Sequence, residues 1–322
     1  MLFYAAALAL AAACSSMPAT DNQNPIVVPP APTDSSLADL GLNASLNGKQ
    51  MFPATDLWNQ PIDTAQIDPK SGAILARIGL TKNLHPDFGA NIDGAPFGIP
   101  YIVVPDTLHR STVSFDYADE SDPGPYPIPA NPPIENGSDG HLLVIVQHEW
   151  KLYELFGLSQ NGGQWSAGSG AIFDLANGTT RPAGWTSADA AGLPILPGLV
   201  RYDEVYGRMA ITHALRFTVQ HTREAYVAPA RHWASSSNDS LLAPMGMRVR
   251  LKASVDISSY PAPAQVILLA LKRYGMIVAD NGSDFFLSGT ADSRWNDDVN
   301  NTLKQLQVND FEVVRMQGIV TP

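Results

Sequence analysis

Residues 209–220 read MAITHALRFTVQ, and this stretch decides the fold class because its apolar side chains recur at every second position. Ile, Leu, Phe and Val alternate there with small or polar residues. A period of two residues is that of a β-strand with one buried face. We therefore predict a strand over 209–220, with His213 on its apolar face.

Short apolar runs of this kind recur along the chain, separated by many of its 26 prolines and 25 glycines. Many short strands with few long helical patterns are typical of β-sandwiches and related folds. The sequence therefore predicts a mainly β protein with a β-sandwich or jelly-roll-like core. Its further strands are expected at 99–104, 112–117, 142–147, 151–156, 171–175, 247–254, 276–280, 285–288 and 311–315.

The last sixty residues carry a different pattern. A helix is predicted over 264–274, because Pro261 and Pro263 precede it and Gly275 follows it. A second helix is expected over 296–306, and Asn281-Gly282 between two apolar runs predicts a hairpin turn. Residues 262–322 are thus expected to form a small α/β portion packed on the β core.

The N-terminal residues 2–13 are almost wholly apolar and end in three alanines directly before Cys14, the only cysteine of the chain. A run of 12 residues is shorter than the roughly 20 that a membrane-spanning helix needs. Such a run before small residues indicates an export signal. It resembles a bacterial lipoprotein signal, which implies lipidation of Cys14 and, with Ser15-Ser16, an outer-membrane anchor. Secretion without a lipid is the alternative.

These features divide the chain into three parts. Residues 1–13 are predicted to be the signal peptide. Residues 14–48 are rich in Pro, Ser, Asn and Asp and show no periodicity, so we expect the lipidated cysteine and a flexible tether there. Residues 49–322 are long enough for a single globular β-rich domain.

Composition narrows the classes of partner. The net charge is −11, and no basic stripe is available for phosphates, so we expect no nucleic-acid partner. The membrane is expected to be reached through a lipid anchor only. With one cysteine, no internal disulfide can form.

Standard catalytic signatures such as G-x-S-x-G, G-x-x-x-x-G-K-[ST] and H-E-x-x-H are absent. Candidates therefore come from ionisable residues on apolar strand faces. By alternation Glu154 shares a face with Trp150, Leu152 and Phe156, and His213 lies on the apolar face of its own strand. Burial raises the pKa of a carboxyl group and suits it to acid–base work. Glu154 and His213 are the leading acid–base pair. Purely structural roles in the core are the alternative.

Further candidates lie nearby in the sequence. Asp174 and Asp189 are second-rank catalytic carboxylates, since glycoside hydrolysis uses pairs of carboxyl groups. Aromatic rings in loops suit stacking on sugars, whereas core packing is the more common fate of a Trp. The expected substrate-binding residues are Arg216, His232, Trp185, Tyr202 and Arg181.

No metal site is predicted. His141 and His148 flank one strand and are expected on opposite faces, so they are poor partners for one ion. No other histidine spacing compels a site. No cofactor is therefore expected, and a structural Ca²⁺ ion in the Asp-rich loops is the one case left open.

Residues 142–257 resemble a type of secreted bacterial protein. The resemblance rests on GAIFDLANGTTRPAGWTSADAAGLPILPGLVRYDE at 170–204, HALRFTV at 213–219 and PARHW at 229–233. It transfers no catalytic residue. The chain is also loosely similar to jelly-roll glycan-active proteins in its many short strands and its polar residues on sheet faces, which is an analogy of fold.

Together these observations predict an extracytoplasmic glycan-active enzyme of the glycoside hydrolase or polysaccharide lyase type. Its partner would be a polysaccharide or oligosaccharide, handled by carboxylate and histidine acid–base chemistry. The alternative is a non-catalytic carbohydrate-binding or cell-envelope scaffold lipoprotein.

Overall fold

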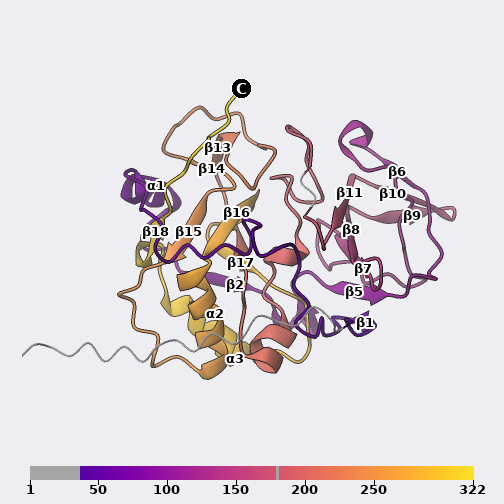
Figure 1. The fold of residues 1–322 in the computed structure, drawn as a ribbon, viewed down its shortest axis with the longest axis horizontal. Helices are drawn as coiled ribbons and strands as arrows, with labels where there is room; N and C mark the ends of the chain where they lie inside the picture. Colours follow the sequence, from indigo (N-terminus) through magenta and orange to yellow (C-terminus); the bar gives the residue numbers. More distant parts are fainter. Residues whose placement is uncertain (1–36, 179–180) are drawn as a thin grey trace, which may run out of the picture. The chain divides into compact units, whose positions relative to one another are not determined.

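The fold is mainly β, as predicted, with several sheets, few helices and a sandwich-like arrangement (Figure 1). The computed structural model describes residues 37–178 and 181–322. The predicted signal peptide, Cys14 and the first part of the predicted tether lie outside the described residues. The described residues belong to one compact unit.

A five-stranded sheet is built mainly from the first half of the chain. Its β5 and β7 are parallel, and its other neighbours are antiparallel. Every residue of the central strand β7 is buried, because the sheet has apolar cores on both of its faces. In order, its strands are β1 Gly41–Leu42, β5 Tyr101–Val104, β7 Leu142–Val146, β8 Lys151–Phe156 and β11 Ser169–Asp174.

One of these two cores is a small one shared with a three-stranded sheet. Tyr126 and Tyr153 meet there edge to face with their ring centroids 5.9 Å apart, beside Leu142, Val144 and Leu155. The burial of these rings and aliphatic side chains stabilises the contact between the two sheets. In order, the three strands are β6 Val113–Phe115, β10 Gln164–Ala167 and β9 Ser159–Asn161.

A six-stranded sheet holds most of the second half of the chain. Its β12 is parallel to β16 on one side and antiparallel to β17 on the other. Helices α1, Ser71–Ile78, and α2, Ala262–Arg273, contact its β18 and β15 (Figure 1). In order, the strands are β18 Phe311–Val313, β15 Arg248–Leu251, β16 Met276–Asn281, β12 Leu215–Val219, β17 Phe286–Ser288 and β2 His85–Asp87.

Shorter elements complete the described fold. β13 Thr222–Tyr226 pairs with β14 Ala243–Met245, and β3 Gly89–Ile92 pairs with β4 Ala95–Phe97. The predicted helix over 264–274 is α2, and the one over 296–306 is α3 followed directly by η4. The remaining helical turns are η1 Ala118–Glu120, η2 Leu196–Gly198, the π-helical η3 Asp203–Arg208, α3 Asp297–Asn301, η4 Thr302–Gln305 and η5 Val308–Asp310.

The predicted strand over 209–220 is wrong in its first half, since β12 begins only at Leu215. Met209 has a left-handed backbone with a φ of 54° and ends η3, and the N–H of Ala210 donates to the carbonyl of Glu204. The apolar side chains Ile211 and Leu215 are buried nonetheless. The alternation of apolar residues therefore predicts which side chains are buried, whereas the paired strand begins only at Leu215.

The hairpin predicted at Asn281-Gly282 is also wrong. Strands β16 and β17 flank β12 instead of pairing with each other, and the N–H of Gly282 donates to the carbonyl of Val219 in β12. β16, β17 and β18 lie in the same sheet as β2, β12 and β15. The C-terminal portion therefore contributes strands to this sheet instead of packing on the β core as a separate α/β portion.

The predicted tether extends too far along the chain. Residues 37–48 contribute β1, which pairs with β5, and Ala38 and Leu46 are buried. The N–H of Leu46 donates to a carboxylate oxygen of Asp203 at 2.9 Å. Paired backbone and buried apolar side chains place these residues in the domain.

Across residues 37–178 and 181–322, no helix combines the length and the apolar character that crossing a bilayer requires.

Gly246, which lies between β14 and β15, is packed closely against the backbone of Val227, and a substitution at this position tests that packing. Gly246 has a φ of 80°, and a Cβ there would lie 1.9 Å from the carbonyl oxygen of Val227. Gly246→Ala should lower the free energy of unfolding by at least about 2 kcal/mol more than Gly162→Ala, because overpacking adds to the backbone term. Gly162 is the matched control, with a φ of 57° and nothing within 4 Å. Urea unfolding of both variants measures the difference, and equal losses would contradict the packing described.

Candidate functional site

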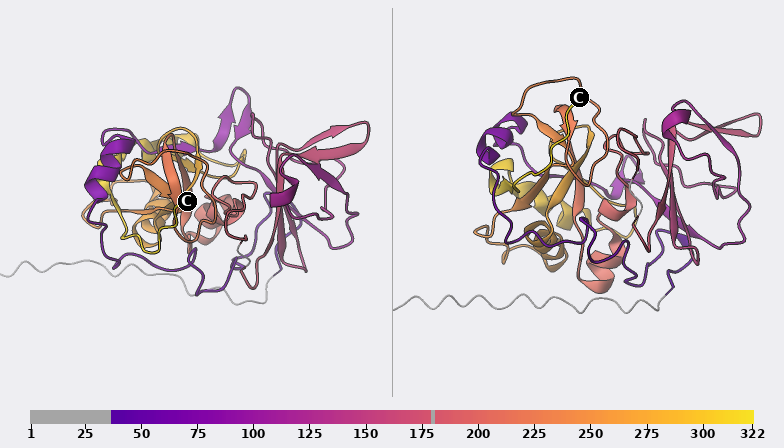
Figure 2. Two further views of the ribbon diagram at one scale, coloured as in Figure 1. Left: turned by 90° about the horizontal axis from the view of Figure 1, so that it is seen from above. Right: turned by 45° about the horizontal axis from the view of Figure 1, so that its top comes forward.

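A long loop, residues 181–199, lies between the five-stranded and six-stranded sheets (Figures 1 and 2, salmon). Glu154 of β8 binds one end of it, where the N–H groups of Ile195 and Leu196 donate to the carboxylate at 2.9 to 3.0 Å. Asp189, near its middle, binds Arg216 of β12. The loop is therefore fixed to both sheets through buried carboxyl groups.

The ion pair of Asp189 with Arg216 is bidentate. Nη2 donates to Oδ1 at 2.8 Å and Nε donates to Oδ2 at 3.1 Å, while Nη1 donates to the hydroxyl of Ser288 at 2.6 Å. Both charged side chains are buried. Every guanidinium nitrogen thus has a partner inside the protein, and Arg216 holds a structural position instead of the substrate-orienting one predicted.

Asp280, the next to last residue of β16, forms a hydrogen bond to Asp189 between their carboxyl groups. Burial, and then the negative charge of Asp189, raise the pKa of Asp280 to about 8. Asp280 therefore carries a proton at neutral pH and donates it to Asp189. Sequence reasoning missed this residue, although a carboxyl group that directly follows the buried run 276–279 was a usable signal.

A cavity of about 310 Å³ opens beside this carboxyl pair. It brings together two of the predicted residues, Asp189 and His232, with one that was not predicted, Asp280. Its lining is mixed in character, with acidic, aromatic and hydroxyl side chains. The other principal lining residues are Tyr117, Glu120, Phe156, Ser169, Thr186 and Ser187.

His232 offers a free ring nitrogen at this cavity. Its Nδ1 lies 2.7 Å from the carbonyl oxygen of Ala190, which can only accept, so we assign the ring proton to Nδ1. In the neutral ring, Nε2 then carries a lone pair. A histidine in this tautomer can take a proton from a water molecule or a hydroxyl group.

Glu154 is fully buried but is not among the described residues that line the cavity. Both of its oxygens accept backbone N–H groups of the loop. Burial raises the pKa of Glu154 to about 7, although these hydrogen bonds oppose the shift. Its place behind the loop makes it an anchor for the segment that carries Asp189.

His141 contacts the same loop at Ala188, the residue directly before Asp189. Its Nδ1 faces the carboxylate of Glu135, and its Nε2 lies 3.0 Å from the carbonyl of Ala188. Burial alone lowers the pKa of His141, but the hydrogen bond and charge of Glu135 outweigh it, so its pKa is raised. A protonated His141 can donate from both ring nitrogens.

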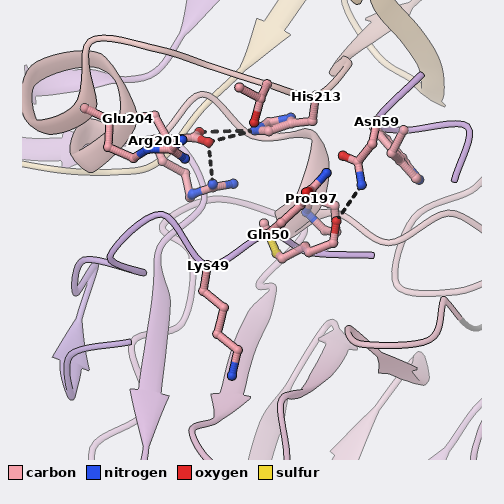
Figure 3. A pocket seen from close by; sticks show the side chains of 11 residues that line it. Lys49, Gln50, Asn59, Pro197, Arg201, Glu204 and His213 are labelled. Atoms are coloured by element: carbon pink, nitrogen blue, oxygen red, sulfur yellow. Dashed lines mark hydrogen bonds and ion pairs between the residues drawn. The ribbon is translucent and has the colours of Figure 1, made fainter. Parts of the chain in front are cut away.

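His213 lies at a different place. Its Nε2 is 3.1 Å from Glu204, which also binds Arg201, and its Nδ1 is 2.8 Å from the carbonyl of Ala214 (Figure 3). Burial raises the pKa of Glu204, but Arg201 and His213 outweigh it and lower that pKa. The carboxylate of Glu204 and the carbonyl of Ala214 are therefore both acceptors that face the ring nitrogens of His213.

The cavity beside His213 has a volume of about 10 Å³, which suits one water molecule and no sugar. His213 is therefore part of a buried ion-pair cluster that stabilises η3. The predicted pair of Glu154 and His213 is not brought together in one cavity, since one residue lies behind the loop and the other lines this small space.

Two other predicted residues have structural contacts. Asp174 ends β11, the strand that Ser169 begins, and its Oδ1 accepts the N–H groups of Ala176 and Asn177 in a turn. Arg181 donates to the carbonyl of Thr186 at 2.9 Å and binds Asp122, so it clamps its own loop.

The predicted aromatic residues lie beside arginines. Trp185 is half-buried with the guanidinium of Arg181 5.3 Å from its ring centroid. Tyr202 stacks on Tyr206 with the ring centroids 4.7 Å apart, and the guanidinium of Arg294 lies 4.3 Å from the ring centroid of Tyr202. Neither Trp185 nor Tyr202 is among the described residues that line the cavity of the carboxyl pair.

In the described part of the chain, no group of three or more His, Cys, Asp or Glu side chains is arranged to hold a metal ion. The carboxyl pair itself is engaged with Arg216 and with a shared proton.

Comparisons of the chain with protein-family models, with curated proteins and with solved structures found no match. The chemistry of the side chains around the cavity is therefore the basis for assigning a function.

The position of Glu154 predicts a pH-dependent stability. Its pKa is 4.5 when unfolded and about 7 in the fold, so the folded protein binds the extra proton between these values. Raising the pH from 4.5 to above 7 should therefore destabilise the wild type by about 3 kcal/mol relative to Glu154→Gln, which cannot ionise. Urea unfolding of both proteins at several pH values measures this difference. Parallel pH curves would refute the role given to Glu154.

Proposed function

We propose that the protein is an acid–base enzyme that hydrolyses a glycosidic bond in the cavity beside Asp189 and Asp280. The observation that carries the proposal is the hydrogen-bonded carboxyl pair on the wall of a 310 Å³ cavity. A protonated carboxyl group at neutral pH is what a general acid requires. Ionisable groups with shifted pKa values in a cavity are typical of active sites, although ion-pair networks also produce them.

Asp280 is the proposed general acid. It holds a proton at neutral pH because burial, and then the charge of the neighbouring Asp189, raise its pKa to about 8. In the reaction the hydroxyl of Asp280 turns from Asp189 toward the leaving oxygen, the bond between the anomeric carbon and that oxygen breaks, and the oxygen takes the proton. The proton returns from solvent after product release.

His232 is the proposed general base. Its Nδ1–H is held by the carbonyl of Ala190, which leaves Nε2 to accept a proton from the attacking water. The oxygen of that water bonds to the anomeric carbon. The sum of the two steps is the addition of one water across the glycosidic bond.

Glu120 supplies a further carboxyl group to the cavity, besides Asp189 and Asp280. Its Oε2 accepts the N–H of Thr186 at 2.9 Å, which fixes the carboxylate at the cavity wall. A fixed negative charge stabilises the oxocarbenium-like transition state. Asp189 and Asp280 are in hydrogen-bond contact and so are too close to flank a glycosidic bond, where roughly 5 Å or more separates the two carboxyl groups.

Hydrolysis is favoured over elimination by the charges at the site. Elimination beside a uronic carboxylate needs a cation to neutralise that carboxylate. No Lys or Arg is among the described lining residues, and Arg216 is fully engaged with Asp189 and Ser288. The cavity therefore suits an uncharged sugar better than a uronic acid.

Aromatic side chains at the cavity suit a sugar ring. The ring of Tyr117 is 56% exposed, and Phe156 lies in the same lining. An exposed ring can stack on the apolar face of a pyranose. The proposal includes the extracytoplasmic location predicted from residues 1–14. In that location the protein would meet glycans of the cell envelope or of the extracellular medium.

Substitution of the acid and of the base tests the proposal. Asp280→Asn and His232→Gln should each lower kcat/KM on a responsive glycan by about 10²- to 10⁴-fold, the usual contribution of a general acid or base. Release of reducing ends from a panel of neutral glycans measures it. Asp256→Asn, in an exposed turn, is the matched control and should keep full activity. Full activity in both site variants would sink the assignment.

The pKa of Asp280 predicts the alkaline limit of activity. Asp280 loses its proton as the pH rises through about 8, so kcat/KM should fall by about tenfold per pH unit above that value. A pH–rate profile from pH 5 to 10 measures it. An activity that is flat up to pH 10 would show that another group acts as the acid.

A non-catalytic carbohydrate-binding role is the second candidate. The exposed side chain of Tyr117 favours this role, because it can contact a sugar without any catalysis. The ion pair of Asp189 with Arg216 also favours it, because such a pair can have a purely structural function. Retention of a glycan by the wild type with no turnover in the same panel would select this role.

A further inference from the structure

A second cavity, of about 220 Å³, lies where β2 and the β3–β4 hairpin meet α3 and η4. Its polar lining includes His85, Asn300 and Lys304, and its apolar lining includes Phe88, Phe97 and Ile92. None of its lining residues lines the cavity of the carboxyl pair. The two sites can therefore be tested separately.

Two buried polar atoms at this cavity have no hydrogen-bond partner among the described residues. One is Nδ2 of Asn300, a residue that is 3% exposed. The other is Nδ1 of His85, whose ring stacks on Phe286 with the centroids 4.0 Å apart. Buried polar groups are nearly always hydrogen-bonded, so a pair of unpartnered atoms in one cavity points to a ligand.

The chemistry of the two atoms is complementary. Nδ2 of Asn300 can only donate. Burial, and then the positive charge of Lys304, lower the pKa of His85, which favours the neutral ring. With its proton on Nε2, a neutral His85 presents Nδ1 as an acceptor. One donor and one acceptor in the same cavity can serve the carbonyl and the N–H of a secondary amide, which point in opposite directions in the trans form.

We propose that this cavity binds the acetamido group of an N-acetylhexosamine. The carbonyl oxygen would accept from Asn300, and the amide N–H would donate to Nδ1 of His85. The methyl group would contact Phe97 and Phe88. Such a site would hold an N-acetylated glycan at a distance from the acid–base cavity.

A carboxylate fits the cavity less well, although Lys304 is a cation. Asp297 also lines it, and its oxygens accept the N–H groups of Ala90 and Asn91 at 2.7 and 3.1 Å, which hold the carboxylate at the cavity wall. A carboxylate there repels an anion. A neutral His85 also adds no charge to attract one.

Binding of N-acetylglucosamine by the full chain tests the proposal. Ligand-observed NMR and calorimetry should detect this sugar, and glucose, which lacks only the acetamido group, should bind at least about tenfold more weakly. Asn300→Ala and His85→Phe should each weaken binding of N-acetylglucosamine by about tenfold. His85→Phe keeps a ring to stack on Phe286 and gives a second variant if Asn300→Ala folds poorly.

Two controls separate this site from the proposed active site. Asn161→Ala, at an exposed turn of the three-stranded sheet, should leave binding unchanged. Asp280→Asn should also leave it unchanged, so loss of binding in that variant would place the sugar in the acid–base cavity and overturn the proposal. The proposal would also be overturned if glucose bound as tightly as N-acetylglucosamine, or if acetate bound in place of the sugar. It would be overturned if no probe bound at all, since water would then be the occupant of the cavity.

Discussion

The buried ion pair of Asp189 with Arg216 is the interaction on which the arrangement of the two large sheets depends. It fixes the middle of loop 181–199 to the six-stranded sheet, while Glu154 fixes the end of the same loop to the five-stranded sheet. Removing one partner of a buried ion pair leaves an uncompensated charge, which destabilises a protein by roughly 3–5 kcal/mol. The loop therefore keeps one position, and one wall of the larger cavity is made by its residues 186–190.

The same ion pair determines the chemistry at that wall. Arg216 pairs with the carboxylate of Asp189, and burial, followed by the negative charge of Asp189, keeps the neighbouring Asp280 protonated although the charge of Arg216 opposes this. An element that stabilises the fold thus affects the protonation state of a group at the cavity. Because the three guanidinium nitrogens are all engaged, Arg216 cannot also bind an anionic substrate.

The sequence predicted several of the longer strands well, missed short ones such as β2, β9 and β14, and predicted which strands are neighbours poorly, for a physical reason. Alternation and length are local, so β7, β8, β11 and β16 were found close to their bounds. The insertion of β12 between β16 and β17 depends on contacts some sixty residues apart, and Asn281-Gly282 misled because its local turn chemistry favours a hairpin. Likewise, Glu154 and His213 are buried as expected, but their partners, Ile195 and Glu204, lie outside the strands predicted for them. No local pattern could have paired Asp280 with Asp189, 91 positions earlier.

The two cavities differ in what their buried polar groups still lack. Around the carboxyl pair, Asp189 is paired with Arg216 and Asp280 donates its proton to Asp189, so a substrate must take that proton from an existing hydrogen bond, whereas the lone pair of His232 Nε2 is available to it. At the second cavity the unpartnered atoms belong to neutral side chains, an amide and an imidazole. Leaving a buried neutral group without a partner costs less free energy than leaving a buried charge without one, so neutral groups suit a site that is not always occupied. The division of roles between proton transfer and recognition follows from this difference in the free energy of burial.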